Sequence, residues 1–177
     1  MYESFHNAGL FLINTLFNLY LAVLVVRLIL AYARADYFNP ITRFVINATQ
    51  PIVKPVRAVL PNYAGIEFST LVIIIVLEAL KNVLISLLAS GIPGILPLLI
   101  FSVRDTLLLV LNAFFYAIFF HAVLSWIQPG YSPLGQVLQQ LSDPVMRPLR
   151  RLIPLVGGFD LTPIPALIII ELLIILI

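Results

Sequence analysis

Long apolar stretches alternate along this chain with shorter polar segments that contain proline. Three of the apolar stretches, at about 10–33, 68–89 and 106–127, are long enough to cross the hydrocarbon core of a bilayer as helices. A fourth, at about 161–177, lies near the lower limit of roughly 17 residues for such a crossing. The pattern therefore predicts an all-α membrane protein with four transmembrane helices.

The apolar stretch that contains the third span begins earlier, at residue 95, and as one helix it would be about 50 Å long. That length exceeds the roughly 30 Å of hydrocarbon in a bilayer. Arg104 and Asp105 interrupt the stretch, and the breaker Gly91-Ile-Pro-Gly94 precedes it. We therefore expect the span to start near Thr106, with residues 95–101 as a helical extension or an interfacial turn.

The polar segment that follows the first span returns after the third, displaced by 93 residues. The segment Pro51-Ile-Val-Lys-Pro-Val-Arg57 corresponds to Pro144-Val-Met-Arg-Pro-Leu-Arg150. The repeated proline and glycine positions are Pro51, Pro55, Pro61 and Gly65 in the first copy and Pro144, Pro148, Pro154 and Gly158 in the second. Such self-similarity indicates a duplication. We expect two tandem repeats, 1–91 and 92–177, whose two spans are joined by a loop at 34–67 or 128–160.

The composition agrees with an integral membrane protein. Hydrophobic residues make up 62% of the chain and charged residues only 10%, against about a quarter in soluble domains, and the mean hydropathy is +1.10. Seven of the ten Lys and Arg residues lie in the two loops. Because short basic loops stay on the cytoplasmic side, we expect both loops to be cytoplasmic and both termini periplasmic. The two repeats would then be parallel, related by an axis along the membrane normal.

Each loop is expected to contain two short helices. In the first loop one helix lies between Asn39-Pro40 and Pro51 and a second starts at Pro55, with the same arrangement 93 residues later. Helices of this length are unstable alone in water, so we expect them to lie in the membrane interface. The basic residues expected to face lipid phosphate are Arg43, Lys54, Arg57, Arg147, Arg150 and Arg151. These segments are either packing elements that fix topology or a specific dock for lipid or protein.

Acidic residues inside the spans are repeated as well. Glu78, near the middle of the second span, corresponds to Glu171 in the fourth, and a carboxylate at that depth costs a few kcal/mol. Lys81 lies three residues after Glu78 on the same helical face and can neutralise it. Glu171 has no such lysine, so its expected partners are Arg27 and His121, unless Arg27 extends to the headgroups. These residues form either a polar network that holds the helices in register or a path for protons or ions.

Enzymatic motifs are absent from the sequence. It contains no phosphate-binding glycine loop, no zinc-binding His-Glu-x-x-His and no Gly-x-Ser-x-Gly elbow. It also has no cysteine, which excludes thiol nucleophiles, thiolate metal sites and disulfides. We therefore expect no enzyme and no catalytic, cofactor or metal site, with an isolated haem ligand at His121 as a weaker alternative. No basic arm or soluble module is present to hold nucleic acid directly.

Three motifs carry a resemblance to a known family: Arg34-Ala-Asp-Tyr-Phe-Asn-Pro40, Gln50-Pro-Ile-Val-Lys-Pro-Val-Arg57 and Asp143-Pro-Val-Met-Arg-Pro-Leu-Arg-Arg-Leu-Ile-Pro154. They resemble the YggT family of bacterial inner-membrane proteins, which includes YlmG-like proteins of plastids, and the likeness extends over nearly the whole chain. The resemblance implies an inner-membrane location and links to osmotic tolerance, ion homeostasis, division and the maturation of a b-type cytochrome. It implies no catalytic residues.

Our first functional hypothesis is a non-enzymatic inner-membrane scaffold, or an assembly or stress-tolerance factor. Its expected partners are anionic membrane lipids and other membrane proteins or further copies of this chain. The alternative is a component of an ion or osmolyte transport pathway that uses Glu78, Glu171, Arg27 and His121. A wet passage that reaches the two glutamates would favour transport, whereas tightly packed spans with an exposed apolar groove would favour partner binding.

Overall fold

The computed structural model describes residues 2–63, 65–89, 91, 93–127, 130–152 and 160–177. In these ranges the regular structure is helical, apart from one isolated bridge between Tyr63 and Ile66. The helices are α1 (Tyr2–Tyr32), α2 (Pro40–Arg57), α3 (Phe68–Ala89), α4 (Ile95–Ile127), α5 (Pro133–Arg150) and α6 (Pro163–Leu176). The all-helical fold predicted from the sequence is confirmed for the described residues.

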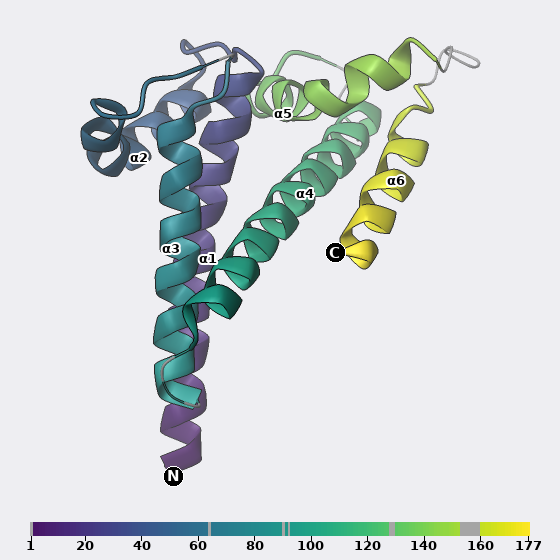
Figure 1. Cartoon of the computed structure of the whole chain (residues 1–177). Helices are drawn as coiled ribbons and strands as arrows, with labels where there is room; N and C mark the ends of the chain where they lie inside the picture. The colour runs from purple at the N-terminus through teal and green to yellow at the C-terminus, as the bar shows by residue number, and fades with distance from the viewer. Residues whose placement is uncertain (1, 64, 90, 92, 128–129, 153–159) are drawn as a thin grey trace.

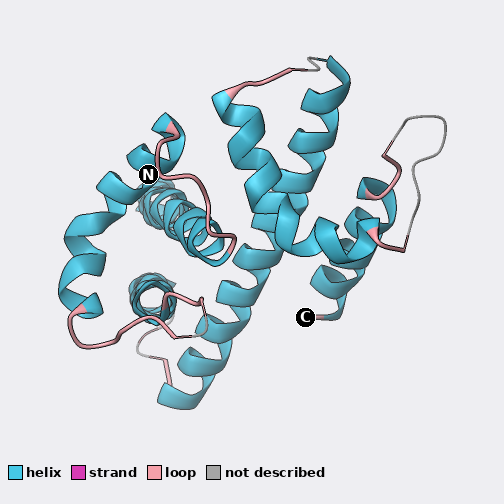
Figure 2. Ribbon diagram, turned by 90° about the horizontal axis from the view of Figure 1, so that it is seen from above, coloured by secondary structure: helices cyan, strands magenta, loops and turns pink. Residues whose placement is uncertain are grey.

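The helices form two groups that follow the order of the chain (Figure 1). α1 and α3 pack along each other and form a long arm. α4 leaves this arm at an angle and packs against α3, α5 and α6. α2 and α5 lie across the same end of the molecule and contact each other there, as the view from above in Figure 2 also shows. The two polar loops therefore meet at one end.

Among the described residues, three helices are long and apolar enough to cross a membrane. The segments concerned are Phe5–Tyr32 of α1, Phe68–Leu88 of α3 and Ile95–Ser125 of α4. α6 is apolar but has only 14 residues, which corresponds to about 21 Å of helix. The segment expected to make the fourth crossing therefore forms a helix shorter than the hydrocarbon thickness.

α4 differs from the sequence expectation. It is one continuous helix of 33 residues, with no break before Thr106. Arg104 and Asp105, which were expected to mark an exit from the membrane, lie within it. Arg104 Nε donates to the main-chain oxygen of Ile177 at 2.9 Å, and Asp105 accepts a hydrogen bond from Asn82 at 3.1 Å. Since Asn82 of α3 and Ile177, the residue after α6, supply these partners, the polar pair is accommodated within α4.

The expectation of two short helices in each loop is wrong. In the described part of each loop there is one helix of 18 residues, and it runs through two prolines. Proline removes an amide donor and strains the preceding turn, but Pro51 and Pro55 lie on the exposed side of α2. The buried side of α2 is unbroken and consists of Thr42, Val45, Thr49 and Val53. Packing along this stripe outweighs the proline defects, so the helix continues through Pro51 and Pro55.

The starts of these loop helices follow the sequence pattern. Asn39 Oδ1 accepts a hydrogen bond from the main-chain nitrogen of Ile41 at 2.9 Å. Ser132 Oγ accepts one from the main-chain nitrogen of Gly135 at 3.0 Å. In both helices proline occupies the first turn, where its missing donor has no cost. Both loop helices therefore begin with a side-chain oxygen that accepts a hydrogen bond from a main-chain nitrogen of the first turn.

The repeated loop positions after these helices are only partly described. Gly65 has a φ of +83°, in the left-handed region that favours glycine. The corresponding positions of the second repeat are Pro154 and Gly158. Both lie outside the described residues.

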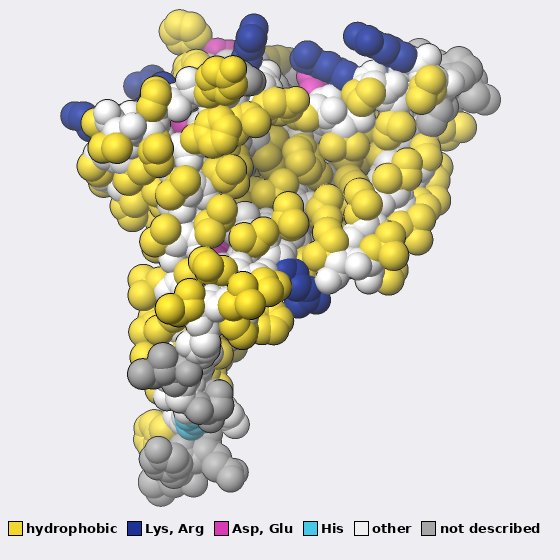
Figure 3. Space-filling view, viewed as in Figure 1, with side chains coloured by type: hydrophobic (Ala, Val, Ile, Leu, Met, Phe, Trp, Pro, Cys, Tyr) yellow, Lys and Arg dark blue, Asp and Glu magenta, His cyan; other side chains and the backbone are white. Residues whose placement is uncertain are grey.

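Apolar packing is concentrated in two clusters. The larger lies mainly between α1, α2 and α3, with Leu24 and Ile74 completely buried. The smaller joins α4, α5 and α6 through Ile118, Met146 and Ile170. Hydrophobic side chains also cover the sides of the molecule, and Lys and Arg on the face shown in Figure 3 gather mainly at the end formed by α2 and α5. This distribution is compatible with a membrane protein.

Candidate functional site

A buried ion pair joins the end of α1 to the residue before α3. Arg27 Nε and Nη2 donate to the two carboxylate oxygens of Glu67 at 2.8 and 3.0 Å. Arg27 Nη1 donates to Thr49 Oγ1 at 2.9 Å and to Gln50 Oε1 at 3.2 Å, both on α2. The two charged side chains are only 5% and 4% exposed. Arg27 therefore connects α1, α2 and the start of α3.

The surroundings of Glu67 favour its ionised form. Burial alone would raise the pKa of the carboxyl group, but hydrogen bonds from Arg27 and Thr70 and the charges of Arg27 and Arg57 lower the pKa below its ordinary value. Thr70 Oγ1 donates at 2.7 Å, and Arg57 Nη1 lies 3.5 Å from Glu67 Oε1. The contact is thus a charged, bidentate arginine–carboxylate pair at neutral pH.

The outer part of this cluster recurs in the second repeat. Arg150 and Asp160 lie 93 residues after Arg57 and Glu67, and Arg150 Nε donates to Asp160 Oδ2 at 3.0 Å. Burial would raise the pKa of Asp160, but hydrogen bonds from Thr162 and Arg150 and the charge of Arg150 lower it. Each loop helix therefore forms an ion pair with the acidic residue that precedes the following apolar helix.

Asn39 joins the two repeats. Its Nδ2 donates to the main-chain oxygen of Pro133 at 2.8 Å and to Gln136 Oε1 at 2.9 Å. Gln136 Nε2 in turn donates to Asp36 Oδ2 at 3.2 Å. Because Asn39 also caps α2, one side chain fixes both the start of that helix and the position of α5.

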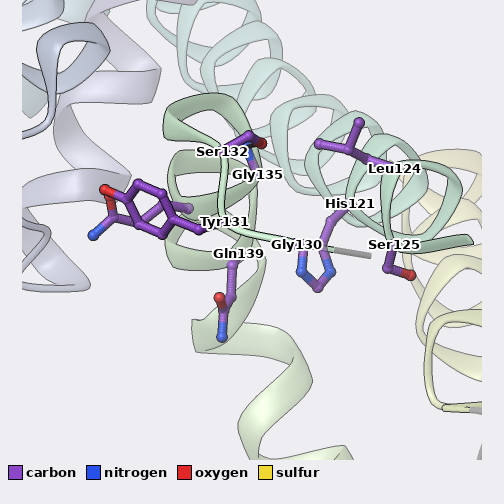
Figure 4. Close-up of a pocket in the computed structure, with 9 residues that line it drawn as sticks. His121, Leu124, Ser125, Gly130, Tyr131, Ser132, Gly135 and Gln139 are labelled. Atoms are coloured by element: carbon purple, nitrogen blue, oxygen red, sulfur yellow. Dashed lines mark hydrogen bonds between the residues drawn. The ribbon is translucent and has the colours of Figure 1, made fainter. Parts of the chain in front are cut away.

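A cavity of about 540 Å³ lies between the end of α4 and the start of α5. His121, Gln136 and Gln139 contribute polar groups to its lining. Figure 4 shows the imidazole of His121 and the amide of Gln139 extending in the same direction, while the ring of Tyr131 points away from them. The described residues contain no cluster of three or more His, Cys, Asp or Glu that could hold a metal ion.

A second group of polar side chains lies deeper between the spans. Lys81 Nζ forms an ion pair with Glu78, three residues earlier on α3, and donates to Asn18 Oδ1 of α1 at 3.0 Å. Glu78 is 1% exposed. The next residue, Asn82, makes the bond to Asp105 of α4 described above. These contacts connect α1, α3 and α4, and such polar contacts are one way in which apolar helices are held together.

The five residues expected to form one intramembrane network are not gathered together. Arg27 and Glu78 each have a partner within the first repeat. Glu171 is exposed on α6, and no ion pair connects it to Arg27 or His121 in the described part of the chain. Sequence reasoning missed Glu67 as the partner of Arg27. The sequence did contain a clue to this pairing. Arg27 lies near the end of one apolar stretch and Glu67 lies just before the next, so both are expected at the same depth in a membrane.

The basic loop residues are distributed over the end formed by α2 and α5. Those that are exposed are Arg43, Lys54, Arg57, Arg147 and Arg151, whereas Arg150 is half-buried. Arg147 and Arg150 lie 2.7 and 3.7 Å from the carboxylate of Asp143. This end thus combines exposed cations with cations that are paired within the fold.

The sequence of this chain is similar to those of a known protein family. The family model CCB3/YggT matches the chain in two parts, residues 6–88 and 100–177. An uncharacterised protein of Pseudomonas aeruginosa is 37% identical over 171 residues, which cover 95% of this chain and 87% of that protein. The uncharacterised protein YggT of Escherichia coli K12 is 34% identical over 157 residues, which cover 89% and 82% of the two chains. No solved structure matches this chain.

Proposed function

Because this chain belongs to the CCB3/YggT family, we propose that it is a non-enzymatic scaffold or assembly factor of the bacterial inner membrane. In this proposal it crosses the membrane four times as two parallel repeats, with both loops cytoplasmic and both termini periplasmic. The two-part family match and the position of α2 and α5 at one end support the repeat arrangement. The protein acts through contacts with anionic lipids and other membrane proteins.

The contrast between Glu78 and Glu171 carries the proposal. Both occupy the same repeat position, but Glu78 is buried against Lys81 while Glu171 is exposed on an apolar helix. The position that matches Lys81 in the second repeat is Ile174, and the position that matches Asn18 is Leu111. The second repeat therefore keeps the carboxylate but has lost both the lysine that pairs with it and the asparagine that binds this lysine.

An unsatisfied carboxylate on a helix that faces lipid costs a few kcal/mol. A membrane helix of another protein removes this cost if it brings a lysine, an arginine or a hydrogen-bond donor against Glu171. The flanking side chains Ile168 and Ile175 are 57% and 72% exposed and offer an apolar surface on the same face of α6. The charge and the apolar surface together favour a partner span that carries a basic residue.

Photo-crosslinking in native membranes tests this role. A photo-reactive amino acid at Ile168 should give a crosslink to a partner protein, while the same amino acid at Val76, an exposed position on α3 of the first repeat, serves as the matched control. Introducing Ile174→Lys places a cation three residues from Glu171, as Lys81 is from Glu78. This change should satisfy the carboxylate internally and reduce the crosslink at Ile168 at least tenfold.

Glu171→Leu should reduce the crosslink to the same extent, because it removes the charge without disturbing a buried contact. A crosslink that persists unchanged in both variants would refute the assignment of Glu171 as the docking group. A crosslink between two copies of this chain would identify the partner as the protein itself.

A transport role is the second candidate, favoured by the line of polar groups at Lys81, Asn82 and Asp105 across α3 and α4. The cavity of about 540 Å³ between α4 and α5 is lined by neither Glu78 nor Glu171, which supports the scaffold instead. Purified protein in liposomes should leave ion flux at the level of empty vesicles. A flux that is lost in Glu78→Gln would favour transport.

A further inference from the structure

A second cavity, of about 330 Å³, lies in the first repeat between α1, α2 and the turn before α3. Its lining includes the polar and charged residues Arg27, Arg34, Thr42, Gln50, Arg57 and Asn62. Its volume is at the lower end of the roughly 300–1,000 Å³ typical of small-molecule sites. The cavity thus has room for a small polar group rather than for a whole lipid.

This cavity and the His121 cavity occupy the same place in the two repeats. Ala31, Thr42 and Ile46 line the first, and the residues 93 positions later, Leu124, Gly135 and Gln139, line the second. The duplication has therefore produced two cavities between a span and its loop helix. Arginines line only the first, so the two have different chemistry.

The first cavity carries an excess of positive charge. Arg27, Arg34 and Arg57 line it together with one carboxylate, that of Glu67. Arg27 uses its donors on Glu67, Thr49 and Gln50, whereas Arg57 makes one contact of 3.5 Å and keeps half of its side chain exposed. Arg34 makes no ion pair with any described residue. Two guanidinium groups are thus free to bind an anion.

The backbone of Arg34 is unusual. Its φ is +53°, the one positive value among the described non-glycine residues. The main-chain bonds from Arg34 to Ala31 (3.2 Å) and from Ala35 to Leu30 (2.9 Å) form the C-terminal motif of α1 in which glycine normally holds this position. An arginine there costs on the order of 1 kcal/mol, and strained residues of this kind cluster at binding sites.

Thr42 adds a second buried feature. It is 1% exposed and its Oγ1 has no hydrogen-bond partner among the described residues. A buried hydroxyl without a partner costs about 1–3 kcal/mol. A polar occupant of the cavity that reaches this hydroxyl would supply the missing bond.

We propose that this cavity binds the phosphate group of an anionic membrane phospholipid. Arginine matches phosphate geometry with paired donors, and basic pockets between spans on the cytoplasmic side are known to bind anionic headgroups. The acyl chains stay in the bilayer beside α1 and α2. The inference rests on the membrane orientation of the proposed function, but not on the partner site at Glu171, which lies in the other repeat.

Lipid titration of the purified protein tests the site. Protein in neutral detergent is titrated with short-chain phosphatidylglycerol, and bound lipid is counted by native mass spectrometry. We expect saturation near one tightly bound lipid per chain. Phosphatidylcholine should bind at least tenfold more weakly, because the arginines repel its quaternary ammonium group. Inorganic phosphate at equal concentration should not compete, since it lacks the acyl chains that keep a lipid beside the site.

Arg34→Gly is the decisive variant, because glycine accepts the left-handed backbone and the fold should keep or gain thermal stability. Its affinity for phosphatidylglycerol should fall about tenfold or more. Arg43→Ala, which removes an exposed charge on α2 outside the cavity, should change the affinity less than about twofold. Equal losses in both variants would overturn the cavity site in favour of general surface charge, and full competition by inorganic phosphate would overturn the lipid as its source.

Discussion

Arg27 and Glu67 lie 40 residues apart in sequence, and their side chains meet in a bidentate contact that is almost closed to solvent. The contact ties the end of one span to the start of the next, and through Thr49 it also holds the loop helix α2. The attraction between the two charges of such a buried pair is largely offset by the free-energy cost of removing both charges from water. Its main effect is therefore to fix one arrangement of α1, α2 and α3.

Breaking the pair on one side should be costly. Glu67→Ala leaves the guanidinium of Arg27 buried without a counter-charge and should lower the free energy of unfolding by about 3–5 kcal/mol. The matched change in the second repeat, Asp160→Ala, should cost only about 0–1 kcal/mol, because Arg150 and Asp160 are each about a third exposed. Urea unfolding in detergent micelles measures both. Equal costs would show that burial does not distinguish the two pairs.

The same carboxylate should set an acid limit to stability. The pKa of Glu67 is lower in the folded protein than its ordinary value of 4.5, so between these two values the unfolded state binds the additional proton and stability falls as the pH decreases. The contribution is complete above pH 4.5 and is lost as the pH falls through the folded pKa. Unfolding should therefore become easier below about pH 4.5 in the wild type, and Glu67→Gln should flatten this dependence. A variant whose pH profile runs parallel to the wild type would contradict the assignment.

The junction between the repeats should depend on the amide of Asn39. Asn39→Asp keeps an acceptor for the cap of α2 but loses the donor to Pro133 and Gln136, and should lower the free energy of unfolding by about 1–3 kcal/mol. Asn39→Ala also loses the cap and should cost about 1 kcal/mol more. A double-mutant cycle with Gln136→Ala should give a coupling of at least about 0.5 kcal/mol. Strictly additive effects would mean that the two side chains act separately.

The long helices were predictable because they depend on local information. Apolar runs of sufficient length specify the helices at about 68–89 and 10–33. The matched prolines and basic residues 93 positions apart predict the repeat, which stays a prediction. The caps at Asn39 and Ser132 follow from residue types that accept a hydrogen bond from the first helical turn.

Partners and helix continuity were less predictable because they depend on packing. Local rules break α2 at Pro51, but its buried stripe continues past that residue and so does the helix. Sequence reasoning offered Arg27 and His121 as candidate partners of Glu171 by the chemistry of the groups alone, with contact to headgroups as the alternative for Arg27. Only the antiparallel packing of α1 and α3 brings Glu67 to the depth of Arg27.

Site-directed labelling tests most directly the central claim that the two repeats enter the membrane with the same polarity. The chain contains no cysteine, so the variants Arg43→Cys in α2, Arg147→Cys in α5 and Asn7→Cys at the start of α1 each report one exposed position. In intact spheroplasts, a maleimide that does not cross the membrane should label Asn7→Cys and should label the other two only after the membrane is opened. Labelling of Arg43→Cys and Arg147→Cys from opposite sides of the membrane would contradict the account.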